Sequence, residues 1–145
     1  MINFPMNSTF NKSSISISVT TKMLQAAMDK AQELGFSISA CIVDEGGNEK
    51  AFARMDGAPL ISIETSRKKA VLAVGFGMPT GDTWQNFVKD DPILEKGAHD
   101  LPGFILLGGG IPIYIDGQLV GAIGISGGHY KMDEQCANAA LEAIV

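Results

Sequence analysis

The most constraining stretch of the sequence is the segment 108–128, GGGIPIYIDGQLVGAIGISGG, which holds eight of the 17 glycines of the chain. Asp116 and Gly117 separate two β-branched runs within it. An Asp-Gly pair favours a two-residue type I′ hairpin turn, because both turn residues need positive φ angles. The segment therefore predicts an antiparallel hairpin in which Tyr114 faces Leu119 and Ile113 faces Val120.

The second strand of this hairpin is expected to present two different faces. Strict alternation places Leu119, Ile123 and Ile125 on one face, and Val120, Ala122, Gly124 and Ser126 on the other. A face of such small residues suits close approach by a helix, by a neighbouring subunit or by a flat ligand. The flanking glycines 108–110 and 127–128 can bend sharply and present bare backbone N–H groups.

Length and composition limit the class of protein. A chain of 145 residues with 46% hydrophobic and 19% charged residues is typical of one soluble globular domain. The net charge of −5 argues against nonspecific nucleic-acid binding. No apolar run reaches the roughly 18 residues of a membrane helix, and residues 1–15 lack signal-peptide features, so we expect a cytoplasmic protein. Cys41 and Cys136 are expected to be reduced, buried thiols.

The amino-terminal third predicts a tail, a strand, a helix and a hairpin. Residues 1–14 form a polar, flexible tail before a single domain over residues 15–145, and Ile15 and Ile17 suggest a short edge strand. Apolar spacing predicts a helix from residue 22 to Gly35, with Thr20 or Thr21 as its N-cap. Residues 37–44 and 48–54 form two strands around a Gly46-Gly47 turn, which places Ile42 opposite Ala51, Cys41 opposite Phe52 and Ser39 opposite Arg54.

The remainder alternates between helices and short strands. A helix over residues 60–75 is expected to bury Leu60, Ile63, Ala70, Val71 and Val74 and to expose the basic run Arg67–Lys69 to solvent. A short helix over 82–89, a loop over 90–102, a strand over 104–107 and a final helix over 131–145 follow. Hairpins without crossovers indicate a mainly antiparallel sheet with packed helices, the α+β class.

Catalytic and metal-binding motifs are scarce. The string from Gly124 to Gly128 matches Gly-x-Ser-x-Gly, but the chain lacks the parallel α/β repeat on which a nucleophile elbow is built. No CxxC or HExxH spacing predicts a metal site. His129 is either an exposed surface imidazole or a ligand or proton donor at a pocket mouth. Arg54 ends a strand, and it either binds a carboxylate ligand or pairs with an acid such as Asp56.

Four blocks of sequence together resemble the GlcG/haem-binding-protein family, which includes the C-terminal module of PduO-type corrinoid adenosyltransferases. The blocks are IVDEGG (42–47), AFARMDGA (51–58), the stretch from Lys69-Ala70 to Gly77-Met78-Pro79-Thr80, and residues 108–128. The resemblance implies a profilin-like, five-stranded antiparallel sheet with helices on both faces, assembled into homo-oligomers. It also implies binding of haem in some members and proximity to cobalamin-dependent diol or glycerol metabolism in others.

The family motifs carry over to particular positions of this chain. Arg54, Lys69, Gly109, Gly110, Gly127 and Gly128 match recurrent positions and are candidate cofactor-binding residues; His129 joins them where members often have Thr. The resemblance therefore implies a tetrapyrrole-binding or accessory protein, with haem or cobalamin as the cofactor. The negative net charge and the lack of a long apolar run argue against a nucleic-acid or membrane partner. Two other functions stay open: an enzyme acting on an organic acid or aldehyde, with Arg54 holding a carboxylate and His129 as acid or base, and a structural oligomer subunit without ligand.

Overall fold

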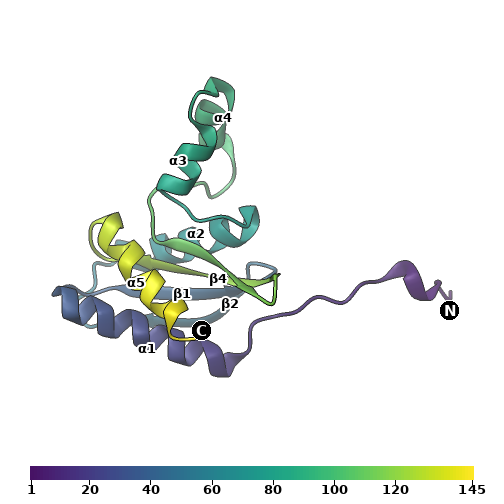
Figure 1. Ribbon diagram of the computed structural model, residues 1–145, viewed down its shortest axis with the longest axis horizontal. Helices are drawn as coiled ribbons and strands as arrows, with labels where there is room; N and C mark the ends of the chain where they lie inside the picture. The colour runs from purple at the N-terminus through teal and green to yellow at the C-terminus, as the bar shows by residue number, and fades with distance from the viewer.

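The computed structural model describes residues 1–145 and contains a four-stranded antiparallel sheet. The strands are β1 (Ser39–Asp44), β2 (Glu49–Arg54), β3 (Gly110–Ile115) and β4 (Gln118–Ser126), in the spatial order β2-β1-β4-β3. The α+β class is confirmed, whereas the expected five strands are not. Residues 104–107 form no strand, because they lie within a segment that projects away from the sheet (Figure 1).

Helices cover both faces of the sheet, as the family resemblance implies (Figure 1). The long helix α1 (Ile17–Leu34) and the last helix α5 (Tyr130–Glu142) pack together on one face, and α2 (Ile61–Phe76) lies on the other. Two short helices, α3 (Asp82–Val88) and α4 (Pro92–Gly97), and two 3-10 turns, Met6–Ser8 and Ala98–Asp100, complete the structure. No helix combines the length and the apolar character that crossing a membrane requires.

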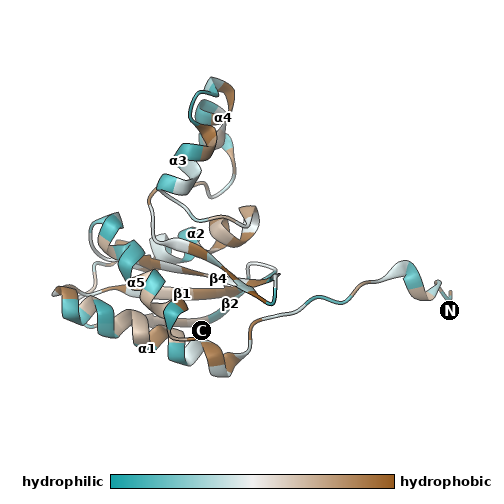
Figure 2. Ribbon diagram, viewed as in Figure 1, coloured by the Kyte–Doolittle hydropathy of each residue, from teal (hydrophilic) through white to brown (hydrophobic).

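The alternation of β1 divides the core into two layers. Ile38, Ala40 and Ile42 face α1 and α5, where they belong to a cluster of 15 buried residues. Cys41 and Val43 face α2 and pack with its alanines. This division of the segment 38–43 between the two faces is the predicted one. Figure 2 shows the result as apolar strands between helices whose outward sides are hydrophilic.

The β1–β2 hairpin has the predicted register but a different turn. Ile42 pairs with Ala51, Cys41 with Phe52 and Ser39 with Arg54, as expected. The loop, however, contains three residues, Glu45–Gly47, because the Asp44 carboxylate accepts hydrogen bonds from the backbone N–H groups of Gly46 and Asn48. A bulge between Ile42 and Val43, where the partner strand has one extra residue, restores the register that a two-residue turn would give.

The β3–β4 hairpin follows the prediction near its turn and departs from it one residue later. Tyr114 pairs with Leu119, but Ile113 pairs with Gly121, because Val120 forms a bulge. Val120 therefore packs into the α1/α5 layer with Ile123 and Ile125, and Leu119 packs on the α2 side. The predicted faces of these two residues are thus wrong. The backbone at the bulge is held by Ile15, whose N–H donates to the Val120 carbonyl.

The first helix begins five residues earlier than expected, so the predicted edge strand is also wrong. Ser16 precedes the first turn, Ile17 is already helical, and the Thr20 hydroxyl donates to the Ile17 carbonyl inside that turn instead of capping it. Gly35 ends the helix with φ 82°, as predicted. The last helix spans Tyr130–Glu142, three residues shorter at its end than the expected range.

Two segments extend from the body of the molecule (Figure 1). We call residues 1–14 the arm; every side chain in it is exposed. We call residues 82–107 the projection; it contains α3, and it forms α4 and a 3-10 turn where the sequence predicted a loop over residues 90–102. A small cluster of Trp84, Val88 and Ala98, backed by Met78, Phe104 and Leu106, forms its interior.

The contact between β4 and α2 predicts a sharp difference between two glycines. A Cβ added at Gly124 would lie 1.9 Å from the Ser66 carbonyl oxygen, whereas one added at Gly75, inside α2, meets nothing within 4 Å. Gly124→Ala is therefore expected to destabilise the fold by about 1–3 kcal/mol or more, and Gly75→Ala to stabilise it by about 0.5–1 kcal/mol. Urea unfolding of both variants measures the difference, and equal midpoints would contradict the close approach.

Candidate functional site

Lys69 lies inside the protein, although the sequence predicted a solvent-exposed basic run. Its side chain is 1% exposed, and its Nζ donates to the Ile125 carbonyl over 2.8 Å and to Asp133 Oδ2 over 3.0 Å. Of the predicted apolar stripe of α2, only Ala70 and Val74 are buried; the rest of the side that faces the sheet consists mainly of small residues, which leaves room for this long side chain. The buried residues of the helix are Ser62, Ser66, Lys69, Ala70, Ala73 and Val74, while Leu60, Ile63 and Val71 are exposed.

Asp133 completes a buried polar knot, by which we mean Lys69, Asp133 and the backbone groups that they bind. Its second carboxylate oxygen accepts a hydrogen bond of 3.1 Å from the Gly128 N–H. Burial raises the pKa of Asp133 and lowers the pKa of Lys69, and the attraction between the two charges opposes both shifts. The knot joins α2, the end of β4 and the first turn of α5.

Sequence reasoning missed Asp133. The signal that could have found it is an acid in the first turn of a helix directly after Gly127-Gly128, where a carboxylate can bind free backbone N–H groups. Its pairing with Lys69, 64 positions away in the chain, carries no local signature.

Gly109 and Gly110, at the start of β3, allow the backbone to approach the knot closely. Gly109 has φ 117°, and a Cβ there would lie 3.2 Å from Lys69 Nζ and 2.7 Å from the Ile125 carbonyl. A Cβ at Gly110 would lie 2.3 Å from the Lys69 carbonyl. Thr80 holds this segment: its hydroxyl donates to the Leu107 carbonyl and accepts from the Gly110 N–H.

The two glycines after β4 are packed in the same way against the segment that follows α1. A Cβ at Gly127 would lie 2.3 Å from the Ser37 carbonyl, and one at Gly128 would lie 2.7 Å from the Phe36 ring. The structure thus brings Lys69 and all four predicted glycines together around one knot. Their contacts are packing contacts within the protein, and their role toward a cofactor stays a prediction.

His129 lies at the edge of this knot as the N-cap residue of α5. Its side chain is exposed and stacks on Tyr130 with the ring centroids 4.5 Å apart, and its Nδ1 accepts a hydrogen bond from the Lys131 N–H. Because Nδ1 acts as the acceptor, the neutral ring carries its proton on Nε2. Ligation of a metal through Nε2 would therefore require the other tautomer and the loss of this cap.

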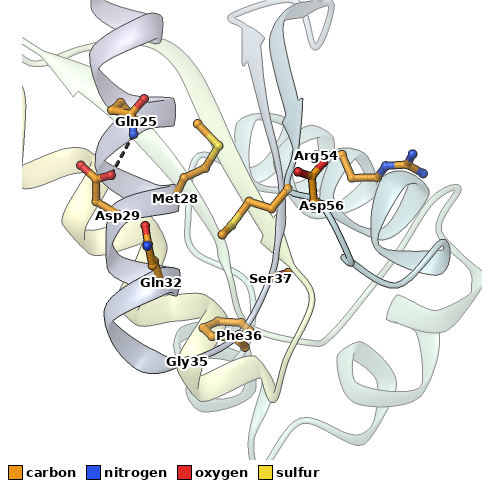
Figure 3. Close-up of a pocket in the computed structure, with 10 residues that line it drawn as sticks. Gln25, Met28, Asp29, Gln32, Gly35, Phe36, Ser37, Arg54 and Asp56 are labelled. Carbon is orange, nitrogen blue, oxygen red and sulfur yellow. Dashed lines mark hydrogen bonds between the residues drawn. The ribbon is translucent and has the colours of Figure 1, made fainter.

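Arg54 lies apart from the knot, beside a groove of about 660 Å³ that we call the α1–β2 groove (Figure 3). The groove is lined by α1 residues between Gln25 and Gln32, by residues 35–37 and by residues 54–56. Its apolar lining consists of Met28, Phe36 and Met55. Phe36 also covers Gly128, so the same ring contacts the knot and lines the groove.

The Arg54 guanidinium is exposed and forms no ion pair, neither with Asp56 nor with another acid. Figure 3 shows it directed away from α1. The residues that line the groove include Arg54 but not His129, so the groove itself does not bring together the two residues expected to hold an acid and to transfer a proton. A second hollow, near Thr80, Gly109 and Glu134, holds about 210 Å³, which is below the usual range of ligand pockets.

Both cysteines are free and buried, as predicted. Burial raises the pKa of the Cys41 thiol and that of the Cys136 thiol to about 12. Neither sulfur is therefore a thiolate near neutral pH, so neither is suited to bind a metal or to attack a substrate.

Comparison with known proteins identifies the family. Residues 15–142 match the family described as haem degrading protein HbpS-like. The chain belongs to this family. It is 31% identical to the protein GlcG of Escherichia coli K12 over 112 residues, which cover 77% of this chain and 81% of GlcG. It is 32% identical to the corrinoid adenosyltransferase PduO of Salmonella typhimurium over 85% of this chain, which corresponds to only 37% of PduO.

Solved structures of family members have the same fold. The crystal structure of HbpS, a protein known from Streptomyces reticuli, matches with a TM-score of 0.86 and 29% identity over 99% of each chain. The structure of a PduOC:haem complex matches with a TM-score of 0.78 and 30% identity, over 90% of this chain and 94% of that one. The recognition from four sequence blocks is therefore confirmed.

The knot predicts different effects for two neighbouring lysines. Lys69→Met leaves the Asp133 carboxylate buried without its partner, so we expect a loss of about 3–5 kcal/mol in the free energy of unfolding. Lys68→Met, an exposed neighbour on the same helix, is expected to change it by less than about 0.5 kcal/mol.

The double variant Lys69→Met/Asp133→Asn should regain much of this loss, because it removes both charges and keeps an acceptor for Gly128. Chemical unfolding of the native protein, Lys69→Met, Asp133→Asn and the double variant gives the coupling energy. Additive effects of the two substitutions would show that the pair is not coupled.

Proposed function

We propose that this protein binds a tetrapyrrole, haem in the first instance, in the α1–β2 groove. The observation that carries the proposal is an arginine without an acidic partner beside the three apolar side chains of the α1–β2 groove. A volume of about 660 Å³ falls within the range of pockets that hold cofactors. A haem needs an apolar surface for its ring and a cation for its propionates. The groove offers three apolar side chains, Met28, Phe36 and Met55, among ten lining residues, which also include Arg54 and the acids Asp29 and Asp56.

Arg54 is suited to bind a propionate. Its planar guanidinium can donate two parallel hydrogen bonds to one carboxylate, and it has no competing acidic partner in the protein. The side chain is exposed, so turning it toward the groove requires no rearrangement of the core. The β1–β2 register pairs Arg54 with Ser39 and so fixes the place of its backbone at the end of β2.

The apolar lining offers a sulfur ligand as well as a surface. Met28 lies on α1 with its thioether in the groove, and thioether sulfur is one of the axial ligands that proteins use for haem iron. The Met55 sulfur already accepts a hydrogen bond from the Ile38 N–H over 3.4 Å. Within the groove, Met28, which is partly packed against the core, would therefore be the residue that binds the haem iron, ahead of the capped His129 and the buried thiols.

The relatives support haem over a corrinoid. A family member, PduOC, has been solved as its haem complex, and the family description itself names haem. The similarity to PduO, a corrinoid adenosyltransferase, covers about a third of that enzyme and does not extend its activity to this chain. A corrinoid ring carries amide side chains in place of propionates, so it would not use the carboxylate-binding geometry of Arg54.

Titration with haemin tests the proposal. We expect a saturable Soret band at one haem per chain, and Arg54→Ala should weaken binding about 5-fold, the equivalent of about 1 kcal/mol for an exposed ion pair. Arg67→Ala is the matched control, because Arg67 is also exposed but lies on α2, where it pairs with Glu64. Equal weakening in both variants, or absorbance that never saturates, would count against the groove.

Replacement of Met28 separates ligation from packing. Met28→Leu preserves volume, so we expect unchanged affinity for metal-free protoporphyrin together with a changed haem spectrum. Met55→Leu serves as the comparison, since its sulfur is bonded to the backbone. A haem spectrum identical in native protein and Met28→Leu would remove Met28 as the ligand without affecting the site itself.

A further inference from the structure

The arm exposes apolar side chains that nothing in its own chain covers. Ile2, Phe4, Met6 and Phe10 are 79%, 76%, 99% and 81% exposed. The arm is anchored to the body at Ile15, which is 2% exposed and whose N–H donates to the Val120 carbonyl. Figure 1 shows the arm running away from the sheet from this point. Apolar residues held clear of the body in this way need another surface.

The projection also exposes apolar side chains that its own packing does not cover. Three buried residues form its interior, too few for a unit of this size to be covered by its own packing. Phe87, Ile93 and Leu101 on its outside are 57%, 84% and 43% exposed. Figure 2 shows hydrophobic bands on this unit, above the sheet and its covering helices.

The charges of the two segments are complementary. The arm contains one charged side chain, Lys12, and no acid. The projection contains five acids and two lysines, and its acids are Asp82, Asp90, Asp91, Glu95 and Asp100. An apolar segment with one positive charge and an apolar surface with an excess of acids favour each other by burial and by the attraction of Lys12.

We propose that the arm of one copy packs along the projection of a second copy of this chain. In Figure 1 the arm and the projection of one chain leave the sheet in different directions, which leaves each free for a neighbour. Each phenylalanine buries about 150–250 Å². Two arms exchanged reciprocally, counted with the surfaces they cover, therefore bury about 1,200–2,000 Å² through their phenylalanines, the range of stable interfaces.

Disulfide trapping between two differently tagged chains tests the contact directly. One chain carries Phe10→Cys and the other carries Ile93→Cys; the native thiols are buried and do not compete. After mixing and oxidation, the two chains should form a disulfide-linked heterodimer, which a reducing agent should separate into single chains. Leu60→Cys replaces Ile93→Cys in the control, because Leu60 is similarly exposed, at 77%, but lies at the start of α2. Equal trapping at both positions would overturn the proposal.

Light scattering after size-exclusion chromatography gives the second readout. Phe4→Ser/Phe10→Ser should lower the particle mass at least two-fold and leave the circular dichroism unchanged, whereas Leu60→Ser should leave both unchanged. A native protein that is monomeric, or a double variant with the native mass, would overturn the proposal. A Phe10→Cys/Ile93→Cys chain that closes only on itself would also overturn it, since the arm would then be covered by its own projection.

Discussion

The buried pair of Lys69 and Asp133 is the constraint on which the rest of the structure depends. Two charges that are almost without solvent contact are costly unless every polar group around them is satisfied. Here the lysine also binds the Ile125 carbonyl, and the aspartate also binds the Gly128 N–H. These bonds join α2, the end of β4 and the first turn of α5, so the pair ties the helices on opposite faces to the same strand.

The close packing around the pair decides where a ligand can lie. The small-residue face of β4 suited a helix, a subunit or a flat ligand, and the structure fills it with α2, whose backbone approaches Gly124 without space for a Cβ. The glycines at both ends of the β3–β4 hairpin serve equally close contacts. A tetrapyrrole cannot enter there, and this is why the proposed site is the α1–β2 groove.

Local chemistry explains which features the sequence could predict. The register of both hairpins near their turns follows from short-range turn preferences, and the division of β1 between two layers follows from strict alternation. Alternation failed at Val120, since a bulge depends on the distant Ile15 backbone. Lys69 was predicted to be exposed because a basic run normally is, and only its partner in α5 makes burial favourable. Family motifs identified Arg54 and the four glycines as candidates. Only the fold shows that Arg54 lies at the α1–β2 groove whereas the glycines lie around the knot.

The proposed ligand site and the root of the arm lie at opposite ends of β4. Arg54 pairs with Ser39, which pairs with Ser126 at the end of β4, whereas the arm is rooted at Val120, near the start of that strand. β4 runs between them and is buried along almost its whole length. A closely packed strand has one stable conformation, so it cannot switch between two conformations and thereby couple its two ends. Haem binding at Arg54 and packing of the arm root at Val120 should therefore be independent of each other. Coupling between them would require a rigid-body movement of the projection, which Thr80 anchors beside the knot.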